Sequence, residues 1–161
     1  MPFFDPIRLG ASGSADAYEI QNSLRHNSGA YLNSSFNGNN QTFTVAMWIK
    51  RGQLDSDMML MSAAGSNHPG GADIHQFGID SSNRLFAFAF INSNSQRYNV
   101  KTNAKLEDCS NWYHLTYNYD STQGTSSNRI RLYINGELQT DLANSDYPSS
   151  NEGNYINGGK P

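Results

Sequence analysis

Trp112–Asp120 reads WYHLTYNYD and Arg129–Leu138 reads RIRLYINGEL, and both runs place apolar or aromatic side chains at every second position. A period of two puts those side chains on one face of a strand, so each run predicts a β-strand with one buried face. Asn135-Gly136 supplies the positive backbone φ angles that a two-residue hairpin turn needs. We therefore expect an antiparallel sheet in this part of the chain.

Other short runs, separated by Asn, Gly and Ser clusters, predict strands along most of the chain. Phe43–Lys50, FTVAMWIK, alternates in the same way, with Trp48 on the face opposite the apolar one. Arg84–Ile91 is apolar on both faces, which predicts a central strand, and Asp80–Asn83 joins it to the preceding strand as a second hairpin. The remaining expected strands are Ser23–His26, Ala30–Ser34, Met58–Ala63, Ile74–Asp80, Arg97–Thr102 and Glu137–Thr140. Strands of this length without a helical period predict an all-β fold, an antiparallel β-sandwich.

Composition narrows the class of partner. The 161 residues suit one domain, and a net charge of −3 with only 16% charged residues provides no basic field for nucleic acid or anionic lipid. Neither nucleic-acid binding nor membrane insertion is expected. The single cysteine, Cys109, cannot form an internal disulfide, so the core must hold the fold.

The first 16 residues have the composition of an extended arm rather than of a core. A proline-punctuated apolar start precedes the flexible sequence GASGSA at 10–15, and the domain is expected to span 17–161. The arm lacks the basic leader and long apolar run of a signal peptide, so export by the secretory route is not expected. Four apolar residues would be costly in water, and we expect them either to anchor the arm on a partner or to pack on the domain itself: Phe3, Phe4, Ile7 and Leu9.

The strand FTVAMWIK, the strand WYHLTYNYD and the hairpin RLYING, in that order, resemble the laminin G-like branch of the concanavalin A-like lectin and glucanase superfamily. The segment from Ser23 to Asn157, with its WIKRG strand end and the stretch Ser121–Leu132, is similar to laminin G-like modules on appendages of tailed bacteriophages. The resemblance implies a concanavalin A-like jelly roll in a virion structural protein, a tail fibre or other appendage subunit made in the host cytoplasm. The arm would bind other virion proteins, and the outward domain would contact host surface glycans.

Two other roles stay open for the same fold: a free carbohydrate-binding module and a capsid decoration protein. Analogy with fibres implies a homo-oligomer, expected as a trimer. Relatives usually continue past Tyr155–Asn157 with one or two further strands, so we expect either a longer gene product or a strand donated by a neighbouring subunit.

The acidic residues do not predict an enzyme. Glycoside cleavage needs two carboxylates at about 5 to 10 Å, and the four glutamates are scattered along the chain, at Glu19, Glu107, Glu137 and Glu152. Asp55 and Asp57 alternate but are expected to be solvated loop residues. Laminin G-like relatives often bind calcium, and Asp and Asn oxygens are plentiful here, so calcium stays open although no segment forms a compact calcium loop. No two histidines have metal spacing, and no other metal or cofactor is expected.

One candidate binding surface remains. Trp48, His114 and Tyr133 point away from the core face of their strands, and neighbouring strands would bring them together as an aromatic platform for sugar rings. In the resembling family, aromatic residues at these positions more often fill a secondary core beneath loops. The sequence leaves both roles open.

Overall fold

The computed structural model describes residues 32–34, 37–65, 73–91 and 95–158. The chain divides after Asn33, and the architecture given below is that of the unit Ser34–Pro161. The expected arm, with Phe3, Phe4, Ile7 and Leu9, and the expected strand Ser23–His26 lie outside the described residues.

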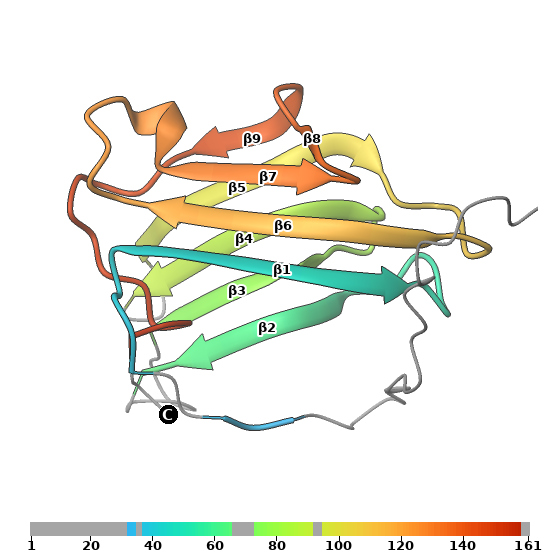
Figure 1. Ribbon diagram of the computed structural model, residues 1–161, viewed down its shortest axis with the longest axis horizontal. Coiled ribbons are helices and arrows are strands. Elements are labelled where there is room, and N and C mark those ends of the chain that lie inside the picture. The colour runs from blue at the N-terminus through green and yellow to red at the C-terminus, as the bar shows by residue number, and fades with distance from the viewer. Residues whose placement is uncertain (1–31, 35–36, 66–72, 92–94, 159–161) are drawn as a thin grey trace, which may run out of the picture. The chain divides into compact units, whose positions relative to one another are not determined.

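Two antiparallel sheets face each other in this unit (Figure 1). The four-stranded sheet has the order β1 (Thr42–Lys50), β6 (Trp112–Asp120), β7 (Ile130–Ile134), β8 (Glu137–Leu138). The five-stranded sheet has the order β2 (Met58–Ala64), β3 (Ile74–Ile79), β4 (Arg84–Ile91), β5 (Ser95–Lys105), β9 (Leu142–Asp146). The described helical structure is one 3₁₀ turn, η1 (Ser126–Asn128). The predicted all-β sandwich of antiparallel strands is confirmed.

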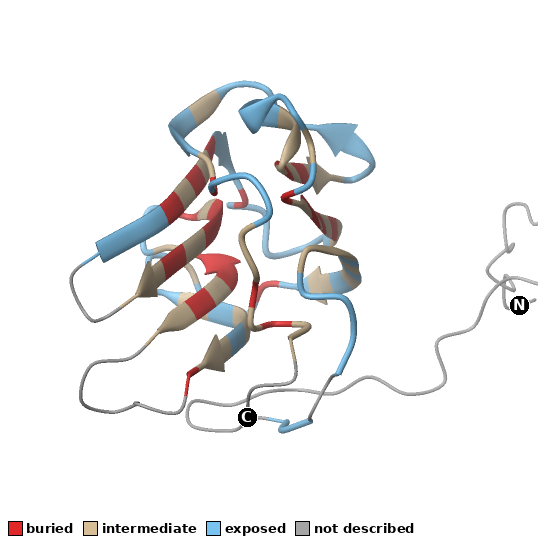
Figure 2. Ribbon diagram, turned by 90° about the vertical axis from the view of Figure 1, so that its left-hand side faces the viewer, coloured by how far each residue is buried: buried red, intermediate tan, exposed pale blue. Residues whose placement is uncertain are grey.

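The core lies between the sheets and follows the alternation in the sequence. Strand β6 buries Leu115, Tyr117 and Tyr119, and strand β4 buries alternate small and branched side chains towards them. Figure 2 shows the buried residues as bands along the strands. The Phe77 and Tyr117 rings stack across the sandwich with centroids 5.1 Å apart, so the two sheets share one core.

Most of the predicted strands in the described ranges are confirmed, and β4 lies at the centre of its sheet as its two apolar faces indicated. Two expected strands were wrong in extent, and one strand was missed. Leu32–Ser34, the described part of the run expected at Ala30–Ser34, is not a strand, and Glu137–Thr140 is reduced to the two residues of β8. Strand β9, LANSD, was not expected because its polar sequence lacks strand-forming residues; its pairing with β5 holds it in place.

The tight turns use left-handed backbone where the sequence permits it. Asn135 and Gly136 have φ of 53° and 83°, the pair of positive values that the predicted hairpin requires. Asn83, at the end of the β3–β4 turn, has φ of 65°. These turns fix the register of both hairpins, which decides what lies on the outer side of each sheet.

The C-terminal segment 147–158 crosses one end of the sandwich (Figure 1) and brings polar groups into it. Asn154 is fully buried, and its amide nitrogen donates hydrogen bonds to the Tyr98 hydroxyl at 2.7 Å and the Tyr117 hydroxyl at 3.0 Å. The Asn154 side-chain oxygen accepts from the backbone N–H of Ile156, which is itself in the core. The segment is thus part of the folded core.

Candidate functional site: an exposed aromatic hollow

The side of the four-stranded sheet that faces away from the core is called the outer face below. It is formed by the side chains that alternate with the buried ones: Thr42, Thr44, Ala46, Trp48 and Lys50 of β1; Trp112, His114, Thr116, Asn118 and Asp120 of β6; Arg131 and Tyr133 of β7; and Leu138 of β8. Register pairs Lys50 with Trp112 and Trp48 with His114. Aromatic residues therefore gather at one end of this face.

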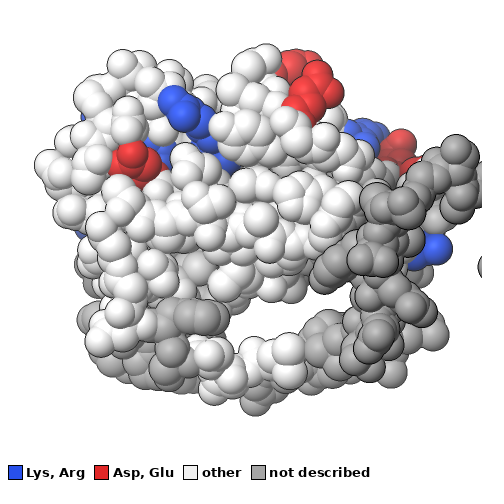
Figure 3. Space-filling model, viewed as in Figure 1, with Lys and Arg blue, Asp and Glu red and all other residues white. Residues whose placement is uncertain are grey.

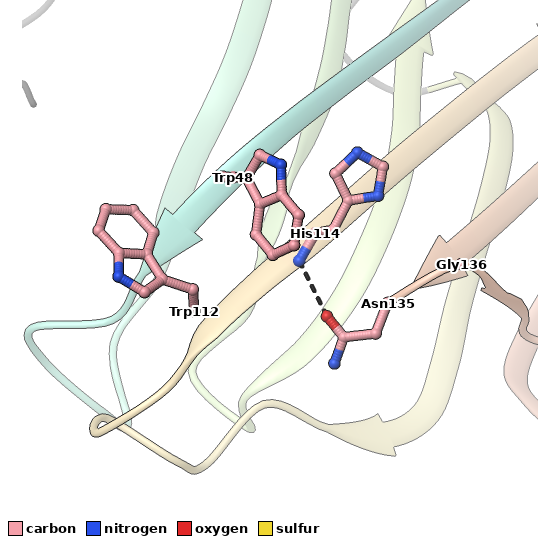
Figure 4. Close-up of a pocket in the computed structure, with 5 residues that line it drawn as sticks. All are labelled: Trp48, Trp112, His114, Asn135 and Gly136. Atoms are coloured by element: carbon pink, nitrogen blue, oxygen red, sulfur yellow. Dashed lines mark hydrogen bonds between the residues drawn. The ribbon is translucent and has the colours of Figure 1, made fainter. Parts of the chain in front are cut away.

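This aromatic end surrounds an open hollow of about 410 Å³. Its lining consists of Trp48, Trp112, His114, Asn135 and Gly136 (Figure 4). The Trp48 and His114 rings lie 5.0 Å apart between centroids, tilted by 48°. Strands β1 and β6 thus supply the aromatic walls, while the β7–β8 turn supplies the polar edge.

The turn is tied to the floor of the hollow by two hydrogen bonds. The backbone N–H of His114 donates to the Asn135 side-chain oxygen at 2.9 Å, and the backbone N–H of Asn135 donates to the His114 carbonyl at 2.7 Å. Because the Asn135 oxygen is used in this way, its amide N–H groups remain to donate to a ligand. Two hydrogen bonds thus hold Asn135 beside His114.

Both tryptophans of the chain are in this hollow, and both are exposed, Trp48 by 61% and Trp112 by 45%. Exposed apolar surface of this kind is typical of a binding site, because contact between large apolar side chains and water is unfavourable. The ring faces are suited to the apolar C–H faces of sugar rings, and the neighbouring amide and imidazole nitrogens to hydroxyls.

Of the three residues predicted to form the platform, the structure brings two together. Trp48 and His114 are register partners and line the hollow, and Trp48 is 61% exposed. Tyr133 is half-buried on the same face, opposite Thr116 and beside Leu138, but does not line the hollow. Tyr133 lies on β7, beside β6, and is the outward residue that precedes the Asn135 turn.

Sequence reasoning missed three lining residues, Trp112, Asn135 and Gly136. The signal for Trp112 was present, because it stands two positions before His114 and so shares its face. The position of the turn required the pairing of β6 with β7, which sets Asn135 beside His114.

The two alternating aspartates, Asp55 and Asp57, are not part of the lining and have structural partners. Asp55 is exposed but its carboxylate accepts a hydrogen bond from the Asn83 amide at 2.8 Å, and Asp57 accepts one from the Ser81 backbone N–H at 2.8 Å. Both therefore brace the β3–β4 turn. The lining of the hollow includes no carboxylate, and the described residues form no group of three His, Cys, Asp or Glu side chains able to hold a metal ion.

Charge is sparse on the outer face. Where grey atoms do not cover it, Figure 3 shows this face largely uncharged over β1 and β6, with basic atoms over β7 and acidic atoms towards its margins. The charged members of the face are Lys50, Asp120 and Arg131. The aromatic hollow is therefore bordered by charge but does not contain it.

A buried polar cluster lies inside the sandwich, away from this face. His75 on β3 is fully buried, with its Nδ1 3.1 Å from the Tyr98 hydroxyl and its ring 4.6 Å from the Tyr155 ring. Burial lowers the pKa of His75 to about 4, a shift that the carboxylate of Asp73 partly offsets and Arg97 reinforces. Burial also raises the pKa of Tyr98 and of Tyr117. These groups stay neutral, which suits a packing role.

Comparison with known proteins locates the chain among relatives. The family model described as the concanavalin A-like lectin/glucanases superfamily, a laminin G model, matches residues 24–161. One solved structure, the native heptameric SAP-like pentraxin from Limulus polyphemus, is similar, with a TM-score of 0.42 and 15% sequence identity. The match covers 74% of this chain and 57% of the pentraxin chain. No curated protein sequence matches. No helix in the described ranges is long and apolar enough to cross a membrane. With the family model covering most of its length, this chain belongs to the concanavalin A-like lectin/glucanases superfamily.

Proposed function

We propose that this protein is a non-catalytic glycan-binding domain, carried on a phage virion as part of a tail fibre or other appendage, and that it contacts host surface glycans through the aromatic hollow. The single observation that carries the glycan-binding part is the exposure of both tryptophans around one hollow that also offers amide and imidazole nitrogens. The appendage part is supported by the likeness of the WIKRG strand end and the Ser121–Leu132 stretch to phage appendage modules.

The composition of the hollow supports binding without bond cleavage. Hydrolysis of a glycosidic bond uses an acid and a base or nucleophile, in most families two carboxylates flanking the bond. The residues that line the hollow are two tryptophans, a histidine, an asparagine and a glycine. Such a set can stack on a ring and hydrogen-bond its hydroxyls, which orients a sugar but supplies no carboxylate pair.

Tryptophan fluorescence provides a direct test, because Trp48 and Trp112 are the two tryptophans of the whole chain. A glycan array identifies ligands, and titration of the best one is expected to change the intrinsic fluorescence. Trp48→Ala and Trp112→Ala should each weaken binding by about threefold to tenfold, the effect of losing one aromatic stacking contact. Met59→Ala is the matched control, because Met59 is also an exposed apolar side chain, at 44%, but lies on the other sheet.

Glycan binding that survives both tryptophan replacements would contradict the proposed site. Failure of all array glycans to bind, with the fold intact by circular dichroism, would contradict the proposed function. A polysaccharide hydrolysis assay checks the non-catalytic part: product formation above the buffer control would refute it.

The appendage role requires a separate experiment. Mass spectrometry of purified particles should find this chain, and its copy number should be a multiple expected for a homo-oligomer, a trimer by analogy with fibres. Strong sugar binding by a monomer that does not associate with particles would instead favour a free carbohydrate-binding module. Particle association on the head would favour a capsid decoration protein.

A further inference from the structure

The outer face has more cations than acids in a chain whose net charge is −3. Its charged side chains are Lys50, Arg131 and Asp120. Lys50 is the register partner of Trp112, so one cation borders the aromatic hollow directly. The other, Arg131, pairs in register with Asn118 further along the sheet.

The acidic residue of this face, Asp120, is hydrogen-bonded to residues of the turn that follows it. The carboxylate of Asp120 accepts hydrogen bonds from the backbone N–H and hydroxyl of Thr122, at 3.1 and 2.6 Å, and from the amide of Gln123 at 2.5 Å. Those bonds, with a smaller contribution from the charge of Arg131, hold the pKa of Asp120 below its usual value. Its oxygens are therefore largely satisfied without Arg131.

Arg131 is left with unused donors. Among the described residues, Arg131 forms no ion pair of 4.0 Å or less. Its guanidinium also donates no hydrogen bond to any described residue. Other arginines contrast with it: Arg129 donates to three backbone carbonyls and Arg51 to three acceptors. Arg131 as a residue is half-buried, and an arginine without an ion-pair partner on a surface of low charge is a ready contact for a carboxylate, sulfate or phosphate group.

The distance between the hollow and Arg131 determines what can reach both. Arg131 is two strands across from Trp48, and four residues along the sheet from Asn135, which lies beside His114. With strands about 4.8 Å apart and residues about 3.4 Å apart along a strand, the two sites are separated by about 17 Å. Small side chains, Ala46 and Thr116, lie between them, with the Tyr133 ring alongside. A monosaccharide is too short to span this distance, and a short linear oligosaccharide is not.

We propose that the outer face binds a linear acidic oligosaccharide, with one ring in the Trp48–Trp112 hollow and an anionic group further along the chain on Arg131. The inference rests on the proposed glycan-binding function and names the class of ligand for the same site. Lys50 lies at the opposite end from Arg131, so a glycan with acidic groups on repeating units meets a cation at each end of the face. Tyr133, predicted from the sequence as a ligand contact, lies between the two sites.

The test compares matched acidic and neutral ligands on the intact chain. Oligogalacturonides from the disaccharide to the hexasaccharide supply carboxylates, their methyl esters are neutral counterparts of equal length, and a sulfated oligosaccharide series distinguishes the kind of anion. Tryptophan fluorescence reports binding in the hollow in every case. Affinity for at least one acidic series should exceed that for the neutral one, rise with length beyond the disaccharide and fall as salt is added.

Variants locate the anion contact. Arg131→Gln should weaken acidic-ligand binding by about threefold to tenfold, as expected for a charge-assisted contact at a partly exposed site, while neutral-ligand binding stays within about twofold. Arg131→Lys, which keeps the charge, should retain part of the difference. Neutral-ligand binding by the glutamine variant also verifies that it is folded.

Two outcomes distinguish failure of the acidic specificity from failure of the proposed glycan-binding function. If acidic and neutral oligosaccharides bind equally and both depend on Trp48, glycan binding stands and the acidic specificity is refuted. If no oligosaccharide of any series changes the fluorescence, the proposed function itself is refuted.

Discussion

His75 is expected to make the stability of this protein depend on pH between about 6.5 and 4. An unfolded chain protonates a histidine near 6.5, whereas the folded protein resists protonation of His75 until about pH 4, because burial opposes the charge. The unfolded state therefore binds more protons throughout this range, and stability falls as pH falls. Above pH 6.5 both states are neutral at this residue and it has no effect on the pH dependence.

The size of the effect follows from the difference of 2.5 between the two pKa values, 6.5 and about 4. At 1.36 kcal/mol per pKa unit the full loss is about 3 kcal/mol, and about 2 kcal/mol of it has occurred by pH 5. Native proteins are stable by only about 5–15 kcal/mol, so this is a large fraction. Groups packed around the ring modulate it: Asp73 raises and Arg97 lowers the pKa, while the neutral Tyr98 and Tyr155 surround the ring.

Urea unfolding at about pH 7.5 and about pH 5, followed by circular dichroism, measures the loss. His75→Gln removes the titrating group, so its stability should change by about 2 kcal/mol less than that of the wild type between these two pH values. His114→Gln, which replaces a histidine of the outer face, is the matched control. Parallel pH dependence in the wild type and His75→Gln would refute the assignment. The carboxylates with lowered pKa, such as Asp120, lose their contribution only at lower pH.

Three further expectations follow from the packing. Gly78→Ala should lower the free energy of unfolding, measured in urea, by about 1–3 kcal/mol, because its new Cβ would lie 2.5 Å from a backbone carbonyl oxygen of β2. Gly124→Ala is the control and should be close to neutral, because nothing lies within 4 Å of its new Cβ. Equal stability of the two variants would contradict this. Arg51→Met should cost about 2–4 kcal/mol, because three acceptors lose a buried guanidinium, and wild-type stability would show that these hydrogen bonds contribute nothing net. Cys109, exposed and unpaired, should react fully with a thiol reagent in the native protein, counted by mass spectrometry; a requirement for denaturant would contradict its exposure.

The assignment of strands could be made from the chain alone, because a period of two is a local property. In Trp112–Asp120 the buried and outward side chains alternate as the pattern predicted, and the Asn135-Gly136 turn has the predicted positive φ angles. Trp48 and His114 could be assigned to a common outward side for the same reason, since each stands opposite an apolar face. Strand β9 could not be found in this way, because its polar residues pair only in the context of β5.

The register between strands that are distant in sequence could not be predicted locally and is decided by the tertiary structure. Nothing local sets Trp48 opposite His114, or Lys50 opposite Trp112, and it is this alignment of β1 with β6 that turns separate aromatic residues into one hollow and leaves Tyr133 outside its lining. The burial of His75 is likewise a product of packing, since Tyr155 comes from the far end of the chain to cover its ring. Alternation is encoded within each strand by backbone geometry, whereas pairing and burial depend on the free energy of the whole assembled sandwich.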